Sequence, residues 1–226
     1  MAPKQVFSKS EYAYEEMKQR ILSDELRPGA AVNQEGIAAE LGISTTPVRE
    51  AFKRLASEGL MVLATHKDAR VTELTFSEAQ SLYEVRLNID PLAARWAAER
   101  RTEGDISAIR TAVSALHPLT GTAELPALIA HREFHRAVYR ASHNDPMIEI
   151  LDSLWDKADR YRQFTLKYRS DTEAEIERVR EEHQALADAV INGEPAAAEA
   201  VMREHISRSL GRQAMEKLRS TETSGS

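Results

Sequence analysis

The sequence predicts a mainly α-helical protein with two domains, a small N-terminal one that includes a β-hairpin and a larger C-terminal antiparallel all-helical bundle. Glycine is scarce, with 9 residues in 226, and such a composition favours helices. Apolar residues recur at helical spacing over most of the chain, and the period changes only around residues 60–74. We therefore expect domains at residues 1–75 and 76–218, followed by a disordered tail at 219–226.

The first domain begins with helical segments. Residues 11–24 carry apolar side chains at helical spacing and form the first helix. Asn33 is positioned to cap the second helix, and Gly42 to end it. A third helix starts near Thr46, and its predicted buried stripe consists of Val48, Ala51, Phe52 and Leu55.

Two short apolar segments follow, residues 60–63 and 70–74, and both are compatible with β-structure. The polar stretch between them includes His66 and Lys67, so the segments predict a two-stranded hairpin with these residues at its tip. Two short helices joined by a tight turn and followed by such a wing indicate a winged helix-turn-helix. We expect His66 and Lys67 to reach a flanking DNA groove.

The second helix of this motif presents a polar face. If its apolar stripe faces inward, Arg49 and Lys53 point outward one turn apart. Thr45 and Thr46 stand at the helix N-terminus, where hydroxyls and free backbone amides suit phosphate oxygens. The fork of Arg49 can read guanine or hold a phosphate. The alternative is a small helical bundle whose exposed basic side chains are only solvated.

Composition constrains these interpretations. The formal net charge is -6 and residues 1–75 are not basic, so any DNA binding must come from a local patch. The absence of cysteine excludes disulfides and thiolate metal sites, and it fits a cytoplasmic location. No apolar run of about 18 residues is present, so we expect no membrane span.

Residues 11–74 resemble the winged helix of the GntR regulator family. The segment LGISTTPVREAFKRLASEGLMV is similar to that family's recognition-helix signature along its whole length. The resemblance implies a homodimer that binds a palindromic operator in double-stranded DNA through Arg49 and the Thr45/Thr46 turn. The chain departs from the family pattern at Thr45, where arginine is frequent, and at Asp68, where glycine is usual and where a carboxylate repels phosphate.

From residue 77 onward the pattern predicts helices separated by turns that contain Asn, Gly or Pro. The predicted ranges are 77–100, 103–116, 124–141, 146–168, 172–191 and 195–217.

Four histidines of the second domain have the spacing of metal ligands. His131 and His135 stand at i and i+4 and project from one helical face. His183 and His205 lie on consecutive helices, roughly 15 and 18 Å from the turn at Gly193 for a rise of about 1.5 Å per residue. They are therefore almost level in an antiparallel hairpin. The alternative is a surface pair together with two hydrogen-bonded core histidines.

Arg86 is a charged member of a core-facing stripe on the first helix of this domain. A buried guanidinium must be paired, so Arg86 either pairs with Asp90 one turn on or binds a carboxylate effector beside the metal. We place Tyr139 with it as an effector contact. Four aromatic side chains line either the pocket or the core: Tyr83, Tyr139, Trp155 and Tyr161.

Residues 77–217 resemble the FCD effector domain of the FadR-like branch of GntR regulators, and six helices suggest its VanR-like subgroup. The resemblance implies a metal held by Asp-x-x-x-His on one helix and by one histidine on each of two later helices. His135, His183 and His205 match these histidines, whereas His131 stands where the family usually has aspartate. Ligation by nitrogen alone favours zinc, with nickel as the alternative, over manganese or magnesium.

These observations predict a metabolite-responsive transcription regulator, a repressor rather than an activator, whose helical domain binds zinc and a small organic acid. The alternative is a metal-dependent hydrolase or lyase with an accessory winged helix, because three histidines and an open position also describe a catalytic zinc site. Glu133 and Glu182 are expected to face away from the histidines, which leaves no general base. We therefore prefer the regulator over the enzyme.

Overall fold

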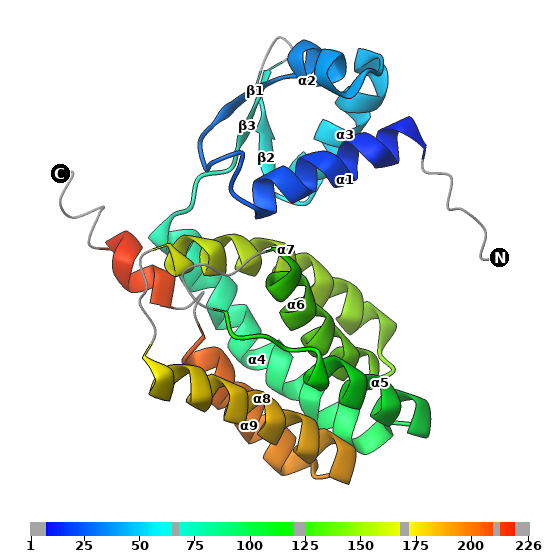
Figure 1. The fold of residues 1–226 in the computed structure, drawn as a ribbon, viewed down its shortest axis with the longest axis vertical. Coiled ribbons are helices and arrows are strands. Elements are labelled where there is room, and N and C mark those ends of the chain that lie inside the picture. The colour runs from blue at the N-terminus through cyan, green and yellow to red at the C-terminus, as the bar shows by residue number, and fades with distance from the viewer. Residues whose placement is uncertain (1–7, 65–67, 120–124, 168–171, 210–212, 220–226) are drawn as a thin grey trace. The chain divides into compact units, whose positions relative to one another are not determined.

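The computed structural model is mainly helical with a small sheet, as the sequence predicts (Figure 1). The chain divides into two compact units, residues 1–74 and 75–226. Of the predicted tail, only Arg219 lies among the described residues, and His66 and Lys67 lie outside them. The structure describes residues 8–64, 68–119, 125–167, 172–209 and 213–219.

The first unit combines three helices with an antiparallel sheet in its described residues. The helices are α1 (Lys9–Leu22), α2 (Gln34–Leu41) and α3 (Thr45–Ser57). The strands are β1 (Ala31–Asn33), β2 (Met61–Leu63) and β3 (Asp68–Val71), in the order β1-β3-β2. The hairpin of β2 and β3 matches the predicted wing, whereas β1 was not predicted.

Local signals set the ends of these helices. The side chain of Asn33 accepts a hydrogen bond from the amide of Gly36 at 3.0 Å and caps α2, as predicted. Gly42 ends α2 with φ of 67°, a left-handed conformation that glycine adopts without steric cost. The predicted stripe of α3 is buried against α1, which contributes Tyr14 and Met17 to the core.

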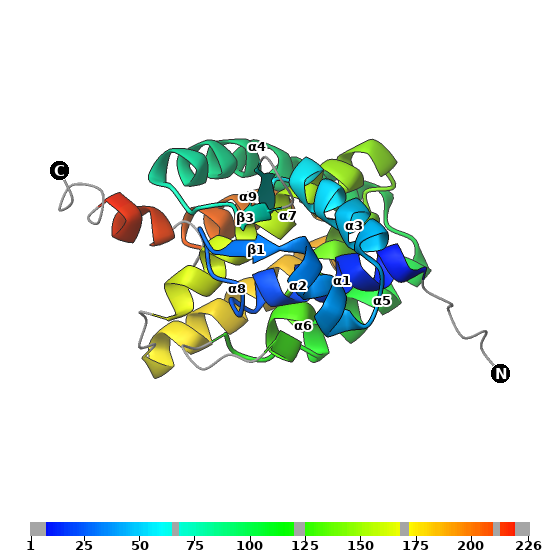
Figure 2. The same ribbon diagram turned by 90° about the horizontal axis from the view of Figure 1, so that it is seen from above.

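The second unit is built from helices in its described residues, and α4 packs along α9 in both views (Figures 1 and 2). Capping boxes at Thr102 and Thr172 start α5 and α8. None of the described helices is long and apolar enough to cross a lipid bilayer. The bounds are α4 (Phe76–Arg100), α5 (Glu103–Ser114), α6 (Leu125–Arg140), α7 (Asp145–Leu166), α8 (Glu173–Asn192) and α9 (Pro195–Ser207).

The prediction of one last helix over residues 195–217 was wrong. Helix α9 ends at Ser207, and a separate helical segment occupies residues 213–219. The sequence from residue 207 to 211 is Ser-Arg-Ser-Leu-Gly, and serine and glycine have weak helix propensity. Seven helical segments rather than six therefore follow residue 75 in the described part of the chain.

A proline inside α4 is matched by a contact from α9. Pro91 has no amide hydrogen, so it cannot donate to the carbonyl oxygen of Leu87 one turn earlier. Arg203 donates a hydrogen bond from Nη1 to that oxygen at 2.8 Å instead. The substitute donor helps fix α9, which carries His205, against α4.

Candidate metal centre and DNA-binding surface

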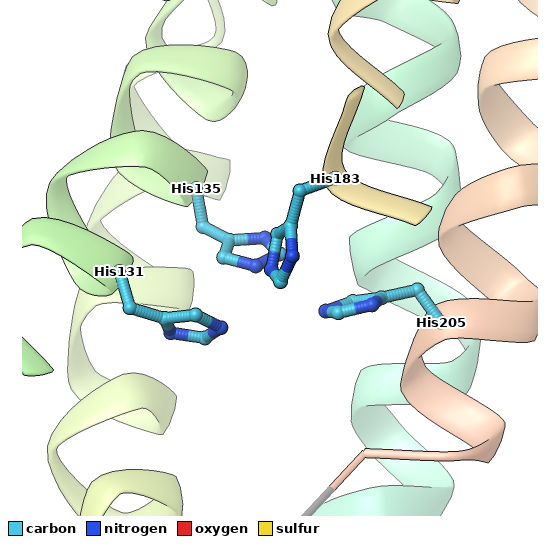
Figure 3. Close-up of side chains that lie close together, drawn as sticks. All are labelled: His131, His135, His183 and His205. Atoms are coloured by element: carbon cyan, nitrogen blue, oxygen red, sulfur yellow. The ribbon is translucent and has the colours of Figure 1, made fainter. Parts of the chain in front are cut away.

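Four imidazoles meet in the interior of the second unit (Figure 3). His131 and His135 project from successive turns of α6, while His183 comes from α8 and His205 from α9. All four are buried, and their potential ligand atoms lie within 4.8 Å of one another. The structure thus brings together every histidine that the spacing selects as a ligand.

Hydrogen bonds outside the cluster orient two of the rings. His183 Nδ1 lies 2.7 Å from the carbonyl oxygen of Val179, and a carbonyl only accepts, so Nδ1 donates. His205 Nδ1 lies 3.2 Å from a carboxylate oxygen of Glu182 and donates in the same way. In a neutral ring with the proton on Nδ1, Nε2 carries the lone pair, which is the arrangement that outer hydrogen bonds impose on metal-bound histidines.

Four other nitrogens of the cluster lack partners among the described residues. Both nitrogens of His135, Nδ1 of His131 and Nε2 of His183 are buried without a hydrogen bond. An unpaired buried polar atom is costly, and four such atoms on three neighbouring rings are rare in a structural core. A divalent cation takes one nitrogen from each ring, so it would satisfy His131, His183 and one of the two nitrogens of His135, and the donor set fits the metal that the sequence suggests.

Three rings of the cluster are held in the unprotonated form that a metal requires. Burial lowers the pKa of His183 to about 3. Burial, followed by the positive charge of Arg162, lowers the pKa of His131 well below its usual value. Burial and the neighbouring His131 do the same for His135. These three rings therefore offer a lone pair at neutral pH without competition from a proton.

Arg86 lies behind the cluster in a network of its own. Its Nη2 donates to Asp90 Oδ2 at 2.7 Å, and both residues are fully buried. Tyr139 donates to the same oxygen at 2.9 Å and accepts from Trp155 at 3.2 Å. The Arg86–Asp90 pair left open by the sequence is therefore formed, yet Arg86 Nη1 keeps no partner among the described residues.

Two cavities adjoin the histidines. One, of about 300 Å³, is lined by His131 and His183 together with residues at the end of α5. The other, of about 50 Å³, is lined by His131, His205 and Arg162 of α7. A small molecule in these cavities would contact the imidazoles directly, and the sequence reasoning did not select Arg162.

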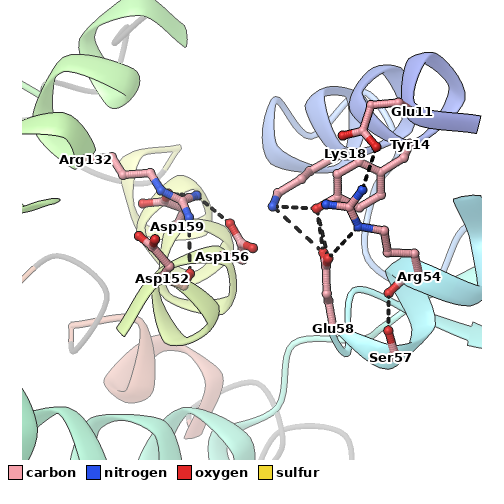
Figure 4. Close-up of polar contacts among 10 residues, drawn as sticks. All are labelled: Glu11, Tyr14, Lys18, Arg54, Ser57, Glu58, Arg132, Asp152, Asp156 and Asp159. Atoms are coloured by element: carbon pink, nitrogen blue, oxygen red, sulfur yellow. Dashed lines mark hydrogen bonds and ion pairs between the residues drawn. The ribbon is translucent and has the colours of Figure 1, made fainter. Parts of the chain in front are cut away.

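Ion pairs fix α7 beside the cluster (Figure 4). Arg132, next to His131 on α6, pairs with Asp156 and reaches Asp159 at 3.5 Å. Asp159 also pairs with Arg162, so one buried carboxylate serves two guanidiniums. Burial raises the pKa of Asp159 although these cations oppose the shift.

The start of α3 forms an exposed polar surface in the first unit. Thr45, Thr46, Arg49 and Lys53 are all exposed. Thr45 and Arg49 also line a hollow of about 170 Å³ together with the first two residues of α2. Two helix N-termini therefore lie at one surface, where their free amides favour phosphate oxygens.

The far end of α3 is used for packing instead. Tyr14 donates to Glu58 at 2.8 Å and accepts from Lys18 at 2.9 Å (Figure 4). Arg54 pairs with Glu11 at 2.9 Å and stacks over the Tyr14 ring, with its Cζ 3.5 Å from the centroid. These contacts hold α1 against α3, whereas the basic residues at the start of α3 stay exposed.

A helix-turn-helix with a following wing, joined to a separate helical unit, defines a DNA-binding transcription regulator with a second domain. The chain belongs to the GntR family of bacterial regulatory proteins. The gntR family model matches residues 9–71, and the model of the FCD domain matches residues 81–208. Members of this family regulate transcription, so the hydrolase or lyase alternative is set aside.

Relatives with curated descriptions agree with this assignment. The probable D-xylose utilization operon transcriptional repressor of Paenarthrobacter nicotinovorans is 28% identical over 179 residues, 79% of this chain and 76% of its own. The transcriptional repressor GlaR of Escherichia coli is 23% identical over 198 residues, 85% of this chain and 90% of its own.

Solved structures show the same fold. E. coli McbR/YncC superposes with a TM-score of 0.77 at 22% identity, covering 96% of this chain and all of its own. A GntR regulator from Rhodococcus sp. RHA1 gives a TM-score of 0.70 at 18% identity, covering 94% of this chain and 98% of its own.

Proposed function

We propose that this protein is a metabolite-responsive repressor that binds a palindromic operator as a homodimer and senses a small organic acid at a metal centre. The ligands are His131, His135, His183 and His205, and the metal is zinc, with nickel as the alternative. The observation that carries this proposal is the set of four buried imidazoles, three of which have nitrogens without a partner. Nitrogen ligation favours these metals over manganese and magnesium.

The metal supplies a buried positive charge that attracts a carboxylate. Helices α6, α8 and α9 hold the imidazoles in place, and the adjoining cavities admit the acid. Arg86 and Tyr139 are proposed as further contacts of the acid; they line neither cavity, and the buried, unpartnered Nη1 of Arg86 supports this role. Acid binding changes the spacing of two recognition helices across the dimer and so alters operator affinity.

Thr45, Thr46, Arg49 and Lys53 are proposed as the DNA contacts. Their exposure at the start of α3 supports this role. Repression rather than activation is supported by the relatives described above as repressors.

Metal content of the full-length protein, purified without chelator, tests the first half of the proposal. We expect about one metal ion per chain, and its loss in His135→Ala, since His135 is fully buried in the cluster. His143→Asn is the matched control, because His143 lies outside the cluster and asparagine tolerates its positive φ of 49°. Equal metal content in both variants, or no metal in the unmodified chain, would contradict the site.

A gel shift on a palindromic promoter fragment tests the second half. Arg49→Ala removes the fork from the start of α3, so we expect an affinity loss of about tenfold or more, consistent with roughly 1–3 kcal/mol for a bidentate base contact. Arg27→Ala is the control, because Arg27 is exposed in the same unit but lies off α3. Undiminished binding by Arg49→Ala would refute the assignment of the recognition helix.

A further inference from the structure

Arg162 is a second buried guanidinium beside the metal centre. Its Nη1 pairs with Asp159, and its Cζ lies 4.7 Å from the centroid of the Trp155 ring. It lines the smaller cavity together with His131 and His205, whereas Arg86 lines neither of the two cavities described above. A guanidinium has five N–H donors in a planar fork, so the contact with Asp159 leaves donors for another carboxylate.

The two cavities adjoin each other. Both are lined by His131 of α6, by Ile176 and Val179 of α8, and by the loop residues Pro118 and Leu119. The larger, at about 300 Å³, lies at the lower end of the usual range for ligand pockets. A small molecule in the larger cavity can approach the metal site where His131 lines that cavity. It can approach Arg162 through the smaller cavity.

Ion pairs neutralise the buried guanidiniums nearest the centre before a metal enters. Asp90 pairs with Arg86, and Asp159 pairs with Arg162 and Arg132. Two further carboxylates near the cluster are also paired, Asp156 with Arg132 and Glu182 with Arg178, and half-buried Glu175 also lines the smaller cavity.

A divalent ion held by neutral imidazoles adds two positive charges to this balanced surrounding. A site with aspartate in place of His131 would leave only one excess positive charge. The second excess charge is therefore due to the histidine at position 131. Buried charge without a counter-charge is costly, and a ligand that carries two negative charges removes the cost. The all-histidine ligand set therefore selects for a dianion over a monoanion.

We propose that the effector is a small dicarboxylate that places one carboxylate at the metal and the other in the fork of Arg162. This rests on the proposed metal site. Two separate anchors, a cation at the histidines and a guanidinium in the adjoining cavity, fit two separate carboxylates. A phosphate carries its charge on one centre and does not span both anchors. Arg162 is then the residue that determines specificity for a second carboxylate.

Calorimetric titration of the zinc-loaded full-length protein tests this with two matched pairs of acids, succinate with butyrate and glutarate with valerate. Within a pair the carbon number is equal and only the second carboxylate differs. We expect the better dicarboxylate to bind about tenfold or more tightly than its partner, as for a charge-assisted hydrogen bond of roughly 1.5–3 kcal/mol. Inorganic phosphate serves as a third probe and should bind more weakly than that dicarboxylate.

Variants then assign the preference to Arg162. Arg162→Gln should lose the preference for the dicarboxylate while its affinity for the monocarboxylate changes little. Arg208→Gln is the matched control, because Arg208 lines the same cavity but its side chain is 54% exposed and paired with Glu204. If Arg162→Gln does not retain zinc, Arg162→Lys keeps the charge without the fork and should reduce the preference at least threefold.

Four results would overturn the inference. Equal affinity for the dicarboxylate and the monocarboxylate in both pairs, with zinc retained, would contradict the dicarboxylate effector but not the metal site. A chain that takes up no metal would remove both proposals. An equal effect of Arg208→Gln and Arg162→Gln would indicate long-range charge rather than a contact with the fork. Tighter binding of phosphate than of either dicarboxylate would indicate an effector whose negative charge lies on a single group.

Discussion

Acid should destabilise the second unit in its metal-free form, because its buried histidines resist protonation. His131, His135 and His183 have pKa values lowered by burial, that of His183 to about 3, whereas an unfolded histidine titrates near pH 6.5. Below about pH 6.5 the unfolded chain therefore binds protons that the folded unit excludes. The free energy of unfolding is thus fully present above that pH and falls as the pH drops toward the folded pKa values.

The magnitude follows from linkage. Between about pH 7.5 and 5.5, each histidine that stays neutral in the folded state costs roughly 1.4 kcal/mol of stability, so three cost about 4 kcal/mol. This is a large share of the roughly 5–15 kcal/mol by which a domain is stable. Metal binding opposes the loss, because the same lone pairs are then engaged.

Urea unfolding after chelator treatment measures this loss. The two tryptophans, Trp96 and Trp155, both belong to the second unit, so their fluorescence reports its unfolding alone. In His135→Gln one titrating group is gone, and the difference between the two pH values should fall by about one third. Equal stability at both pH values, or a difference that His135→Gln leaves unchanged, would refute the reasoning.

Three further predictions concern single contacts. Glu182→Ala removes the acceptor of His205 and should weaken zinc affinity by about 10- to 100-fold in competition with a chromophoric chelator, with Glu182→Gln restoring most of it; full affinity in Glu182→Ala would exclude the orienting role. Thr102→Ala removes a capping box and should cost about 1 kcal/mol in urea unfolding of the second unit; no change would show that the cap is dispensable. Phe52→Ala opens the core of the first unit and should cost about 3–5 kcal/mol there, abolishing operator binding while zinc content stays normal; parallel loss of zinc would contradict two independent units.

Much of the fold could be predicted because local chemistry determines where helices end. In the structure Asn33 caps the start of α2, as its residue type favours. Gly42 and Gly193 end α2 and α8 in the left-handed conformation that glycine favours. The convergence of the histidines follows from the same rigidity. An i, i+4 pair fixes one face of α6, and equal distances from the turn fix the heights of the other two rings.

The rest depends on contacts between distant segments. Strand β1 has three residues, too few for an alternating pattern, and it forms because β3 offers a partner. Glu182 was expected to face away from the histidines, yet it accepts a hydrogen bond from His205 across two helices. Arg162 gives no signal in the sequence, since Arg160 is equally buried and only packing decides which one lines the cavity.

Anomalous diffraction at the zinc edge from crystals of the full-length protein, grown without chelator, tests the central claim most directly. The account predicts one strong peak between His131, His135, His183 and His205, at nitrogen distances of about 2.0–2.1 Å. A map with no peak among these rings, or rings turned apart from one another in the crystal, would contradict a metal-based sensor.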